Sequence, residues 1–394
     1  MSTSLWHASG PLSGREVDIA IVGAGITGLA AAIAFERAGR KAVVLERHAP
    51  AAGASGRNAG YLMRGVAANY ALASRRLGRE TARELWKFNE DNIADLRAES
   101  VTSLPSYRAR PSCLAALAPE EAAEIEESAA MLAEDGFDAE LVRPGSPNAT
   151  DTLWTRGSPR LGLINPHDAV VNPVELVGLL ASRLERTEVH TGCVVDRIEP
   201  DGDGVTLRTT LGLLRAQSVL VATNAYAAHL LPGLTGRVSP NRGQMLAARA
   251  PGVRLDFAYY LNHGSEYVRQ LDDETIIFGG CRTYHADHER TESDETTDEV
   301  QRHIERFLSA LVAEEYTITR RWAGTMGFSP DDLPMAGPTD LGPRVWFCGG
   351  FTGHGMSLAF RTAGVAANAM LGSRPLPAWL RLDRFGRDDA AESN

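Results

Sequence analysis

Cysteine is scarce in this chain of 394 residues, and its 50 acidic residues outnumber its 40 lysines and arginines. The four cysteines are widely spaced and form no CxxC pair, so they predict neither a disulfide framework nor a metal site. They are Cys113, Cys193, Cys281 and Cys348. The net charge of -10 argues against nonspecific binding of nucleic acid. The first residues lack a basic start and an apolar segment, so we expect no secretory signal and a cytoplasmic protein.

One uncharged run is long enough to consider as a membrane span. Residues 19–35 number about 17, which is the lower limit for a spanning helix. Asp18 precedes this run and three glycines interrupt it. The run therefore favours a buried strand and helix, and no membrane span is predicted.

The stretch over residues 16–46 has the pattern of a dinucleotide-binding βαβ unit. A strand-like apolar run ends at Gly23, an apolar helical pattern follows Gly25 and Gly28, and a second strand-like run ends at Glu46. The first glycine permits a tight turn, the second lets backbone approach a pyrophosphate, and the third lets helix and strand pack closely. The carboxylate of Glu46 accepts hydrogen bonds from ribose hydroxyls and repels a 2′-phosphate, which favours FAD or NAD over NADP.

Two further glycine-rich segments accompany this unit. Residues 47–65 hold several glycines and small residues together with Arg57 and Arg64, which suits backbone lying against a flat ligand. A solvated surface loop is the alternative. Near the other end, a strand-like run over residues 344–348 leads through glycines into a long helical pattern. The start of that helix can place positive partial charge on an anionic ring.

Periodicity predicts the remaining elements. Helices are expected over residues 70–99 and 119–133, after Pro173, and after a capping box formed by Thr296 and Glu299. Strands are expected over residues 107–117, 189–198, 204–209, 218–222 and 316–322, with an antiparallel sheet within residues 237–283. Five glutamates of the second helix are expected to form a solvated face: Glu120, Glu121, Glu124, Glu126 and Glu127.

Four segments carry a resemblance to a known family. They are DIAIVGAGITGLAAAIAFERAGRKAVVLER, GASGRNAG, SVLVATNAY and GFTGHGMSLA, the last preceded by SPDDLPMAGP. The chain resembles the FAD-dependent amine and amino-acid oxidoreductases, which include glycine oxidase, sarcosine oxidase, D-amino-acid oxidase and γ-glutamylputrescine oxidoreductase. GASGRNAG is most similar to the last of these.

The resemblance implies a mixed α/β and α+β architecture with two discontinuous domains. A Rossmann-like FAD-binding domain is expected from residues 1–75, 165–235 and 330–394. An antiparallel-sheet substrate domain is expected from residues 76–164 and 236–329.

The resemblance also implies which residues contact FAD. Those of the first glycine-rich turn would hold the pyrophosphate: Gly23, Gly25, Ile26, Thr27 and Gly28. Those on the adenosine side would be Glu46 at the ribose, with Arg47 and Val195 near the adenine. Those along the flavin side would be Ser55, Arg57 and Asn58, with Thr223 at the end of a central strand. Those near the pyrimidine end of the isoalloxazine would be Gly350, Gly353, His354, Gly355 and Met356, which would stabilise negative charge on the ring.

Departures from sarcosine oxidase refine these expectations. Its flavin-linking cysteine is matched by Gly324, so we predict noncovalent FAD. Its carboxylate-binding lysine is matched by Ser357. Arg64 lies close to where that enzyme uses an arginine and is the candidate anchor for a substrate anion, with Arg269 and Arg282 as weaker candidates. No lysine occurs near Tyr267 and Arg269, where that enzyme has its oxygen-activating lysine.

Three residues are predicted to act at the substrate or flavin: Arg64, Tyr267 and His354. Their alternatives are a surface arginine, an aromatic of the sheet core and a core histidine. His285 and His288, with Asp287 and Glu289, form a weak candidate metal cluster, and no metal is predicted.

The implied reaction is oxidation of a C–N bond in a small amine or amino acid. Hydride moves to flavin N5, the imine hydrolyses, and electrons pass to oxygen, giving hydrogen peroxide, or to another acceptor. Position and a deprotonated amine matter more here than a dedicated base. The alternatives are a non-oxidase FAD-binding dehydrogenase subunit and an NAD-dependent dehydrogenase.

Overall fold

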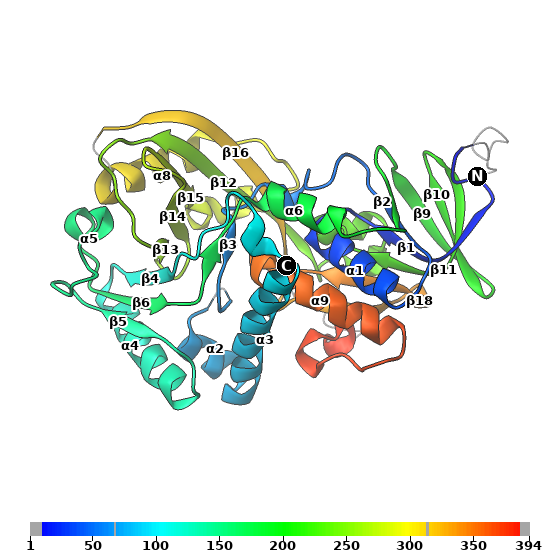
Figure 1. The fold of residues 1–394 in the computed structure, drawn as a ribbon, viewed down its shortest axis with the longest axis horizontal. Coiled ribbons are helices and arrows are strands. Elements are labelled where there is room, and N and C mark those ends of the chain that lie inside the picture. Colours follow the sequence, from blue (N-terminus) through cyan, green and yellow to red (C-terminus); the bar gives the residue numbers. More distant parts are fainter. Residues whose placement is uncertain (1–9, 67, 313–314, 387–394) are drawn as a thin grey trace. The chain divides into compact units, whose positions relative to one another are not determined.

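The computed structural model describes residues 10–66, 68–312 and 315–386 (Figure 1). By their internal contacts these residues form two compact units. The first contains the described residues up to Arg57, Pro173–Asn241 and those from Met326 onward. The second contains the described residues of Asn58–Asn172 and Arg242–Thr325. The domain assignment expected from the resemblance stays a prediction.

The first unit is built on an eight-stranded mixed sheet. Its strands are β1 (Arg15–Val22), β2 (Ala42–Leu45), β8 (Glu188–His190), β9 (Val195–Asp201), β10 (Gly204–Thr209), β11 (Gly212–Val221), β17 (Met335–Thr339) and β18 (Gly342–Gly349). Their order is β17-β18-β11-β1-β2-β8, and β10 and β9 continue from β11. The five strands from β18 to β8 are parallel, and β17 is antiparallel to β18. This is the Rossmann-like sheet expected from the sequence.

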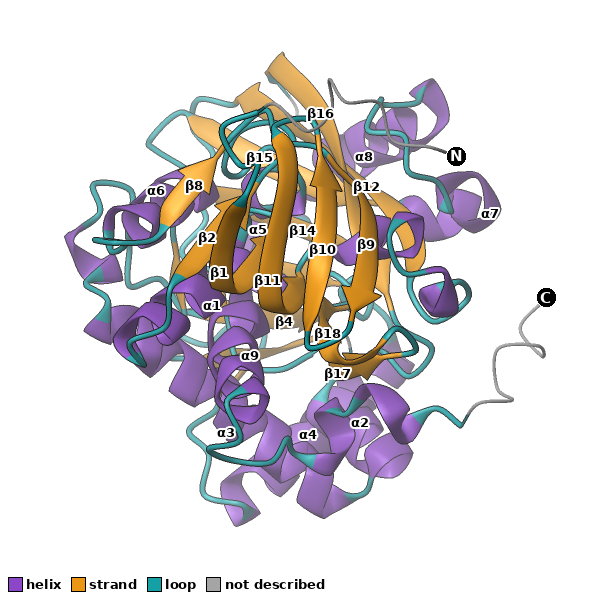
Figure 2. Ribbon diagram, turned by 90° about the vertical axis from the view of Figure 1, so that its right-hand side faces the viewer, coloured by secondary structure: helices purple, strands orange, loops and turns teal. Residues whose placement is uncertain are grey.

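The helices of the first unit are α1 (Ile26–Arg37), α6 (Pro173–Ser182) and α9 (Gly355–Met370). Helices α1 and α9 contact each other and lie side by side (Figure 1). Figure 2 shows them beside the strands of the first sheet. Both helices are rich in buried alanine, which lets them approach closely. After α1 the chain turns at Gly39, whose φ of 74° is in the left-handed region that glycine adopts without strain.

The second unit contains another eight-stranded sheet, with the order β16-β12-β15-β14-β13-β4-β6-β5. Its strands are β4 (Ser112–Ala116), β5 (Glu140–Val142), β6 (Leu161–Asn165), β12 (Ser239–Arg249), β13 (Ala258–Leu261), β14 (Glu266–Gln270), β15 (Thr275–Gly280) and β16 (Thr317–Phe328). The pairs from β12 to β13 are antiparallel, as expected, but β13 is parallel to β4. A separate two-stranded ribbon joins β3 (Tyr61–Leu62) to β7 (Ala169–Val170).

Alternation along these strands gives the second sheet two different faces. One face packs against helix α8 (Asp298–Leu311) through residues such as Tyr259, Val268 and Phe278. The other face carries Met245, Ile277 and half-buried aromatic rings, and the β3–β7 ribbon packs against it. The predicted apolar face of α8, including Val300 and Ile304, is buried in the first of these clusters.

The remaining helices of the second unit are α2 (Tyr70–Leu77), α3 (Arg79–Ala98), α4 (Pro119–Glu134), α5 (Thr152–Arg156) and α7 (Ala286–Glu289). The prediction of a single helix over residues 70–99 is wrong. Gly78 lies between α2 and α3 with φ at 84° and ψ at 145°, which is outside the helical region, so the chain breaks there.

Two further expectations need correction. Glu121 on α4 is not solvated: it is buried and accepts the His263 N–H at 2.6 Å. Burial raises the pKa of its carboxyl. The capping box at Thr296 is also wrong, because Thr297 is the N-cap and makes no side-chain cap. Gln244 instead accepts the Thr297 N–H at 2.9 Å and donates to its hydroxyl at 2.9 Å.

Within the described residues, no helix is long and apolar enough to cross a membrane. The four cysteines are buried free thiols.

Candidate functional site

Three neighbouring parallel strands of the first unit, β1, β11 and β18, end at one edge of the sheet. Gly23 follows β1, and a Cβ placed on it would lie 2.9 Å from the Ala222 carbonyl oxygen at the end of β11. Beyond that strand, Asn224 Oδ1 accepts the Gly350 N–H at 2.9 Å. The two glycine-rich turns predicted from the sequence therefore lie on either side of one strand end. In open α/β sheets this edge is where nucleotide cofactors bind.

The first turn has no room for side chains at its glycines. A Cβ on Gly28 would lie 1.8 Å from the Gly23 carbonyl oxygen, and one on Gly25 would lie 2.7 Å from Ser55 Oγ. Ser55 Oγ accepts the Ile26 N–H at 3.1 Å, at the first turn of α1. Thr27 is buried in the same turn. The helix N-terminus and the Ser55 hydroxyl thus present hydrogen-bonding groups suited to a pyrophosphate.

Glu46 follows the end of β2, and its carboxylate accepts hydrogen bonds from two backbone N–H groups at this edge of the sheet. Its Oε2 accepts the Ala24 N–H and its Oε1 the His48 N–H, each at 2.8 Å. Each carboxylate oxygen has a second lone pair, which leaves capacity for ribose hydroxyls. The Glu46 carbonyl also accepts the Cys193 N–H at 2.8 Å, which brings the start of β9 at Val195 to the same strand end.

The cationic residues after Glu46 differ in their surroundings. The Arg47 guanidinium lies 4.4 Å from the centre of the Tyr226 ring, a cation–π contact. Arg57 Nε donates to the Ala52 carbonyl at 2.9 Å in the first unit. Asn58, which belongs to the second unit, accepts the Gly60 N–H at 2.8 Å.

The second turn holds unusual backbone conformations. Thr352 and Gly353 have φ values of 46° and 82°, and Asn224, which accepts the Gly350 N–H, has 47°. A β-branched residue rarely adopts such a value, and outliers of this kind concentrate at functional sites. The Ser329 N–H donates to Thr352 Oγ1 at 3.2 Å, which helps to hold the turn.

His354 is the N-cap of α9, immediately before Gly355 and the buried Met356. Its Nδ1 lies 3.0 Å from the Thr352 carbonyl oxygen, so Nδ1 must carry a proton to make this bond. Burial lowers the pKa of His354, which favours the neutral imidazole with an unprotonated Nε2. The neutral ring therefore lies at a helix N-terminus with its Nδ1 proton donated to Thr352.

The residues of this edge fit a bound FAD. Besides the glycines, whose lack of a Cβ leaves space, Thr223 at the end of β11 has a buried hydroxyl with no hydrogen-bond partner among the described residues. A buried unpaired hydroxyl is costly, and a ligand group that accepted from it would remove that cost. The assignment of individual residues to parts of FAD stays a prediction.

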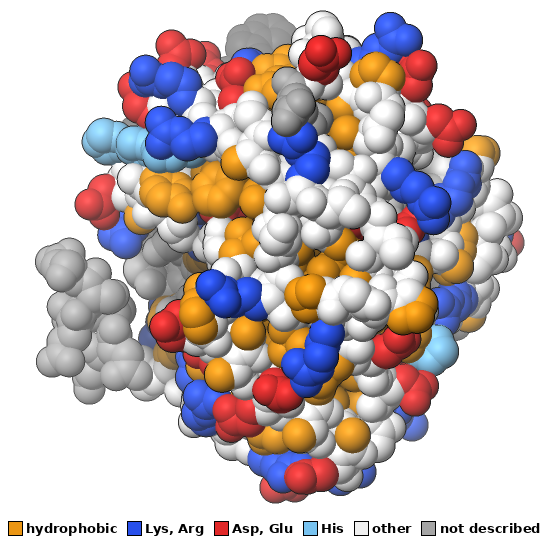
Figure 3. All heavy atoms as spheres, turned by 90° about the vertical axis from the view of Figure 1, so that its left-hand side faces the viewer, with side chains coloured by type: hydrophobic (Ala, Val, Ile, Leu, Met, Phe, Trp, Pro, Cys, Tyr) orange, Lys and Arg blue, Asp and Glu red, His pale blue; other side chains and the backbone are white. Residues whose placement is uncertain are grey.

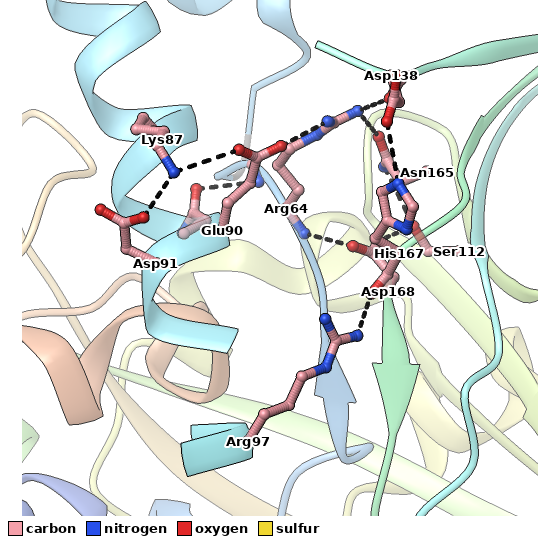
Figure 4. Close-up of polar contacts among 12 residues, drawn as sticks. Arg64, Lys87, Glu90, Asp91, Arg97, Ser112, Asp138, Asn165, His167 and Asp168 are labelled. Carbon is pink, nitrogen blue, oxygen red and sulfur yellow. Dashed lines mark hydrogen bonds and ion pairs between the residues drawn. The ribbon is translucent and has the colours of Figure 1, made fainter. Parts of the chain in front are cut away.

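Arg64, the predicted anion anchor, is buried in the second unit and already has partners (Figure 4). Its Nη1 pairs with Glu90 at 2.9 Å, and its Nη2 donates to Asn165 Oδ1 at 2.9 Å and to the Asp138 carbonyl. Its backbone N–H donates to Asp168 at 3.0 Å. Its role as anchor is untested, but its charge is already balanced by Glu90.

Tyr267 lies on β14, half-buried, on the face of the second sheet away from α8. Its ring contacts those of Tyr61 and Tyr260 edge to face, with centroids 6.3 and 5.9 Å apart. Tyr61 and Tyr260 were missed from the sequence. Arg269 follows two residues after Tyr267, so it shares this face, and the alternation in EYVRQ was the only signal for it.

The candidate metal cluster does not form a site. Glu289 is buried and pairs with Arg242, with oxygen–nitrogen distances of 2.7 and 2.9 Å. In the part of the chain that the structure describes, no group of three or more His, Cys, Asp or Glu residues could hold a metal ion.

The glycine-lined strand ends and the parallel sheet define a dinucleotide-binding protein. A family model described as "DAO: FAD dependent oxidoreductase" matches residues 18–369, so the chain belongs to this family of FAD-dependent oxidoreductases. The resemblance predicted from the four sequence segments is thus confirmed.

The individual relatives have low sequence identity to this chain. The chain is 26% identical over 384 residues to the probable oxidoreductase OrdL of Rhizobium meliloti, covering 91% of this chain and 84% of the relative. It is 25% identical over 377 residues to γ-glutamylputrescine oxidoreductase of Escherichia coli, covering 90% and 84%. The solved structure of L-proline dehydrogenase from P. horikoshii has the same fold, with a TM-score of 0.77 and 18% identity over 92% of this chain and 96% of that one.

Proposed function

We propose that the protein oxidises a C–N bond in a small amine or amino acid, with noncovalently bound FAD as the oxidant. The observation that carries this is the meeting of two glycine-rich turns at neighbouring strand ends of the first unit. Family membership establishes FAD dependence, and it removes the basis for an NAD-dependent dehydrogenase. γ-Glutamylputrescine oxidoreductase and L-proline dehydrogenase are named for amine substrates, which favours the same bond type here.

When bound, FAD would supply the two-electron oxidant for the C–H bond next to nitrogen. The chain's own task is then to position the ring and the substrate. The N-terminus of α9 and its neighbours Gly353 and His354 would place positive partial charge where the ring becomes electron-rich. The neutral His354 would add no charge of its own, because its Nδ1 proton is committed to Thr352. The product imine then hydrolyses in water to a carbonyl compound and an amine or ammonia.

The noncovalent attachment is inferred from the residue at the linking position. Gly324 has no nucleophilic side chain. Cys348 on β18 is the cysteine nearest in sequence, and it is buried, with burial raising the pKa of its thiol. A protonated, enclosed thiol is a poor nucleophile for a flavin link.

The electron acceptor is a second question, and one observation favours an acceptor other than oxygen. Near Tyr267, where sarcosine oxidase has its oxygen-activating lysine, this chain has Arg269, whose guanidinium is buried.

The test is anaerobic reduction of the purified yellow protein by a panel of primary amines, N-methyl amino acids, L-proline and D-amino acids. The proposal predicts that at least one class bleaches the flavin absorbance and yields a carbonyl product in equal amount. Bleaching by dithionite but by no amine would overturn it and favour the noncatalytic FAD-binding subunit. Trichloroacetic acid should release all the flavin into the supernatant, and flavin retained in the pellet would contradict noncovalent binding.

A further inference from the structure

The face of the protein drawn in Figure 3 mixes acidic and basic side chains, so on that face neither charge forms a patch that would favour a charged partner. An unusual contact lies instead at the edge of the first sheet. There Asn224 follows the end of β11 and contacts the segment after β18. Asn224 was missed from the sequence as a site residue.

The backbone of Asn224 has a conformation that few residues adopt. Its φ of 47° lies in the left-handed region. Asparagine enters this region more readily than most residues, and glycine does so at a still lower steric cost. If the turn were the only requirement, glycine would therefore be sufficient at this position. We expect the Asn224 side chain to have a role of its own.

The Asn224 side chain joins two strand ends of the first sheet. Its Oδ1 accepts the Gly350 N–H at 2.9 Å, and Gly350 directly follows the end of β18. The group that Gly350 presents is a backbone N–H, which can only donate. The amide must therefore turn its oxygen, and not its NH2 group, toward Gly350. This bond fixes both the position and the orientation of the amide.

A glycine on a third segment leaves room for this amide. Gly327 lies near the end of β16, in the part of that strand that belongs to the first unit. A Cβ on Gly327 would lie 2.6 Å from Asn224 Oδ1 and 3.0 Å from the Ala225 nitrogen. The φ of Gly327 is outside the left-handed region, so its conformation does not require glycine. The close approach of Asn224 therefore accounts for the absence of a side chain at Gly327.

The same contacts extend to the start of helix α9. The Gly327 carbonyl accepts the N–H of Thr352 at 2.9 Å, and Thr352 lies two residues after Gly350. His354, two residues further on, is the N-cap of α9. Asn224 is thus linked to the helix N-terminus through a short, hydrogen-bonded turn. The positive partial charge of a helix N-terminus falls off within about one turn, so its effect on a bound ring depends on where this turn is held.

We propose that Asn224 is a positioning residue that sets the reduction potential of the bound flavin. Its amide fixes the second glycine-rich turn to the end of β11, and the turn in turn holds the N-terminus of α9 where it stabilises the electron-rich, reduced ring. Asn224 would therefore favour binding of reduced FAD over oxidised FAD, and this difference in affinity is a shift in potential. The inference rests on FAD binding and not on the amine substrate, so a failed amine screen would leave it standing.

The test is the midpoint potential of the bound flavin, measured during slow enzymatic reduction beside a reference dye. Asn224→Gly keeps the backbone conformation and removes the acceptor of the Gly350 N–H. We expect this variant to bind reduced FAD more weakly, relative to oxidised FAD, by about threefold to tenfold. For a two-electron couple this is a fall of about 15 to 30 mV. A residue with only a structural role would weaken both redox forms equally and leave the potential unchanged.

A second variant reaches the same amide from the opposite side. Gly327→Ala places a Cβ 2.6 Å from Asn224 Oδ1, so the amide must move away from Gly350. We expect a fall in potential similar to that of Asn224→Gly. The double variant should show little further change, because the contact that Gly327→Ala disturbs is already absent. Two independent falls that add in the double variant would contradict a shared path through the amide.

Asn262→Gly is the matched control. Asn262 has a φ of 48°, and its Nδ2 donates to Glu266 at 2.7 Å in the second unit. The change thus removes the same side chain from the same backbone conformation, and it should leave the flavin potential at its wild-type value. A shift as large as that of Asn224→Gly would show that the effect is not specific to the second glycine-rich turn and would overturn the proposal.

Two results with Asn224→Gly would also overturn it. One is a potential equal to that of the wild type, and the other is an equal loss of affinity for oxidised and reduced FAD, up to complete loss of both. If Asn224→Gly yields no folded protein, Gly327→Ala decides the question, and an unchanged potential in that variant would contradict the role of Asn224.

Discussion

In the first unit, the ends of three strands present backbone groups, glycines and small hydroxyl residues. In the second, one face of a sheet presents phenol rings and a guanidinium. The first arrangement leaves space and N–H groups for a flat, charged cofactor, and side chains would obstruct it, as the 1.8 Å approach at Gly28 shows. The second arrangement presents side-chain charge and hydroxyl groups, which backbone alone does not supply. The comparison shows that backbone groups form the edge that fits FAD, whereas side chains from distant parts of the chain form the face of the second sheet.

The largest effect is expected from a substitution in the first glycine-rich turn of the first unit. Gly28→Ala places a Cβ 1.8 Å from the Gly23 carbonyl, a backbone atom that cannot move aside, so we expect no folded, FAD-loaded protein. Gly178→Ala in α6 is the matched control, because a Cβ there meets nothing within 4 Å. That change should be neutral or stabilise by about 0.5–1 kcal/mol. Soluble yield and flavin content per protein measure both. A yellow, stable Gly28→Ala variant would refute the tight turn.

The next prediction compares how much stability is lost when each of the two buried arginines of the second unit is replaced. Arg64→Gln removes an ion pair with Glu90 and a donor to Asn165, and should lower the free energy of unfolding by about 2–4 kcal/mol. Arg269→Gln removes a charge that lacks a carboxylate partner, so it should cost clearly less stability. Urea unfolding of both variants gives the comparison. Equal losses would mean that Arg269 is as structural as Arg64.

A pH-dependent effect tests the network around Arg64. Burial raises the pKa of Asp168 to about 7, above its value of about 3.9 in an unfolded chain. A carboxyl whose folded pKa is raised contributes stability that is full below about pH 4 and is lost as pH rises toward 7. Asp168→Asn should remove this contribution, since the amide can accept the Arg64 N–H and donate to Ser112 Oγ, now 2.5 Å from the carboxyl.

The measurement is the free energy of unfolding of wild type and Asp168→Asn from pH 4 to pH 7. The wild type should lose up to about 1.4 kcal/mol per pH unit relative to the variant. Parallel curves for the two proteins would show that Asp168 is ionised throughout.

The smallest effect concerns two tyrosines: Tyr259 on β13, and Tyr61 on β3, whose ribbon packs against the other face of the second sheet. Tyr259→Phe loses a buried hydrogen bond to Asp151 and should destabilise by about 1–2 kcal/mol. Tyr61→Phe loses a hydroxyl with no partner among the described residues, so stability should stay level or rise slightly. Thermal unfolding at fixed FAD concentration would check this pair. A Tyr61→Phe variant as destabilised as Tyr259→Phe would mean that its hydroxyl has a structural partner.

The first unit was predictable because its signals are local. Three glycines at fixed spacing and Glu46 define a turn whose geometry depends on few distant contacts. The same holds for the turn before α9. Its strained Thr352 could not be predicted, because φ there depends on Ser329 and on the neighbouring strand end.

The second unit was less predictable because its groups come together from distant parts of the chain. The sequence offered several arginines and could not tell which would find a carboxylate. Arg64 pairs with Glu90 on α3, whereas the hydrogen bonds of Arg269 within the described residues go to the carbonyls of Ala59 and Val171. The capping-box prediction was wrong for a similar reason. The Thr297 N–H donates to the side chain of Gln244 on β12, a residue distant in the sequence.

The most direct test of the central claim is FAD titration of the apoprotein, with dissociation constants for wild type, Glu46→Gln and Gly353→Ala. Glu46 accepts the N–H of Ala24 in the first glycine-rich turn, and Gly353 lies in the second, with a φ of 82° that alanine adopts with strain. One FAD held by both turns predicts a stoichiometry of one and weaker binding, by about tenfold or more, in each variant. Wild-type affinity in Gly353→Ala would contradict it, because the second turn would then not contact the cofactor.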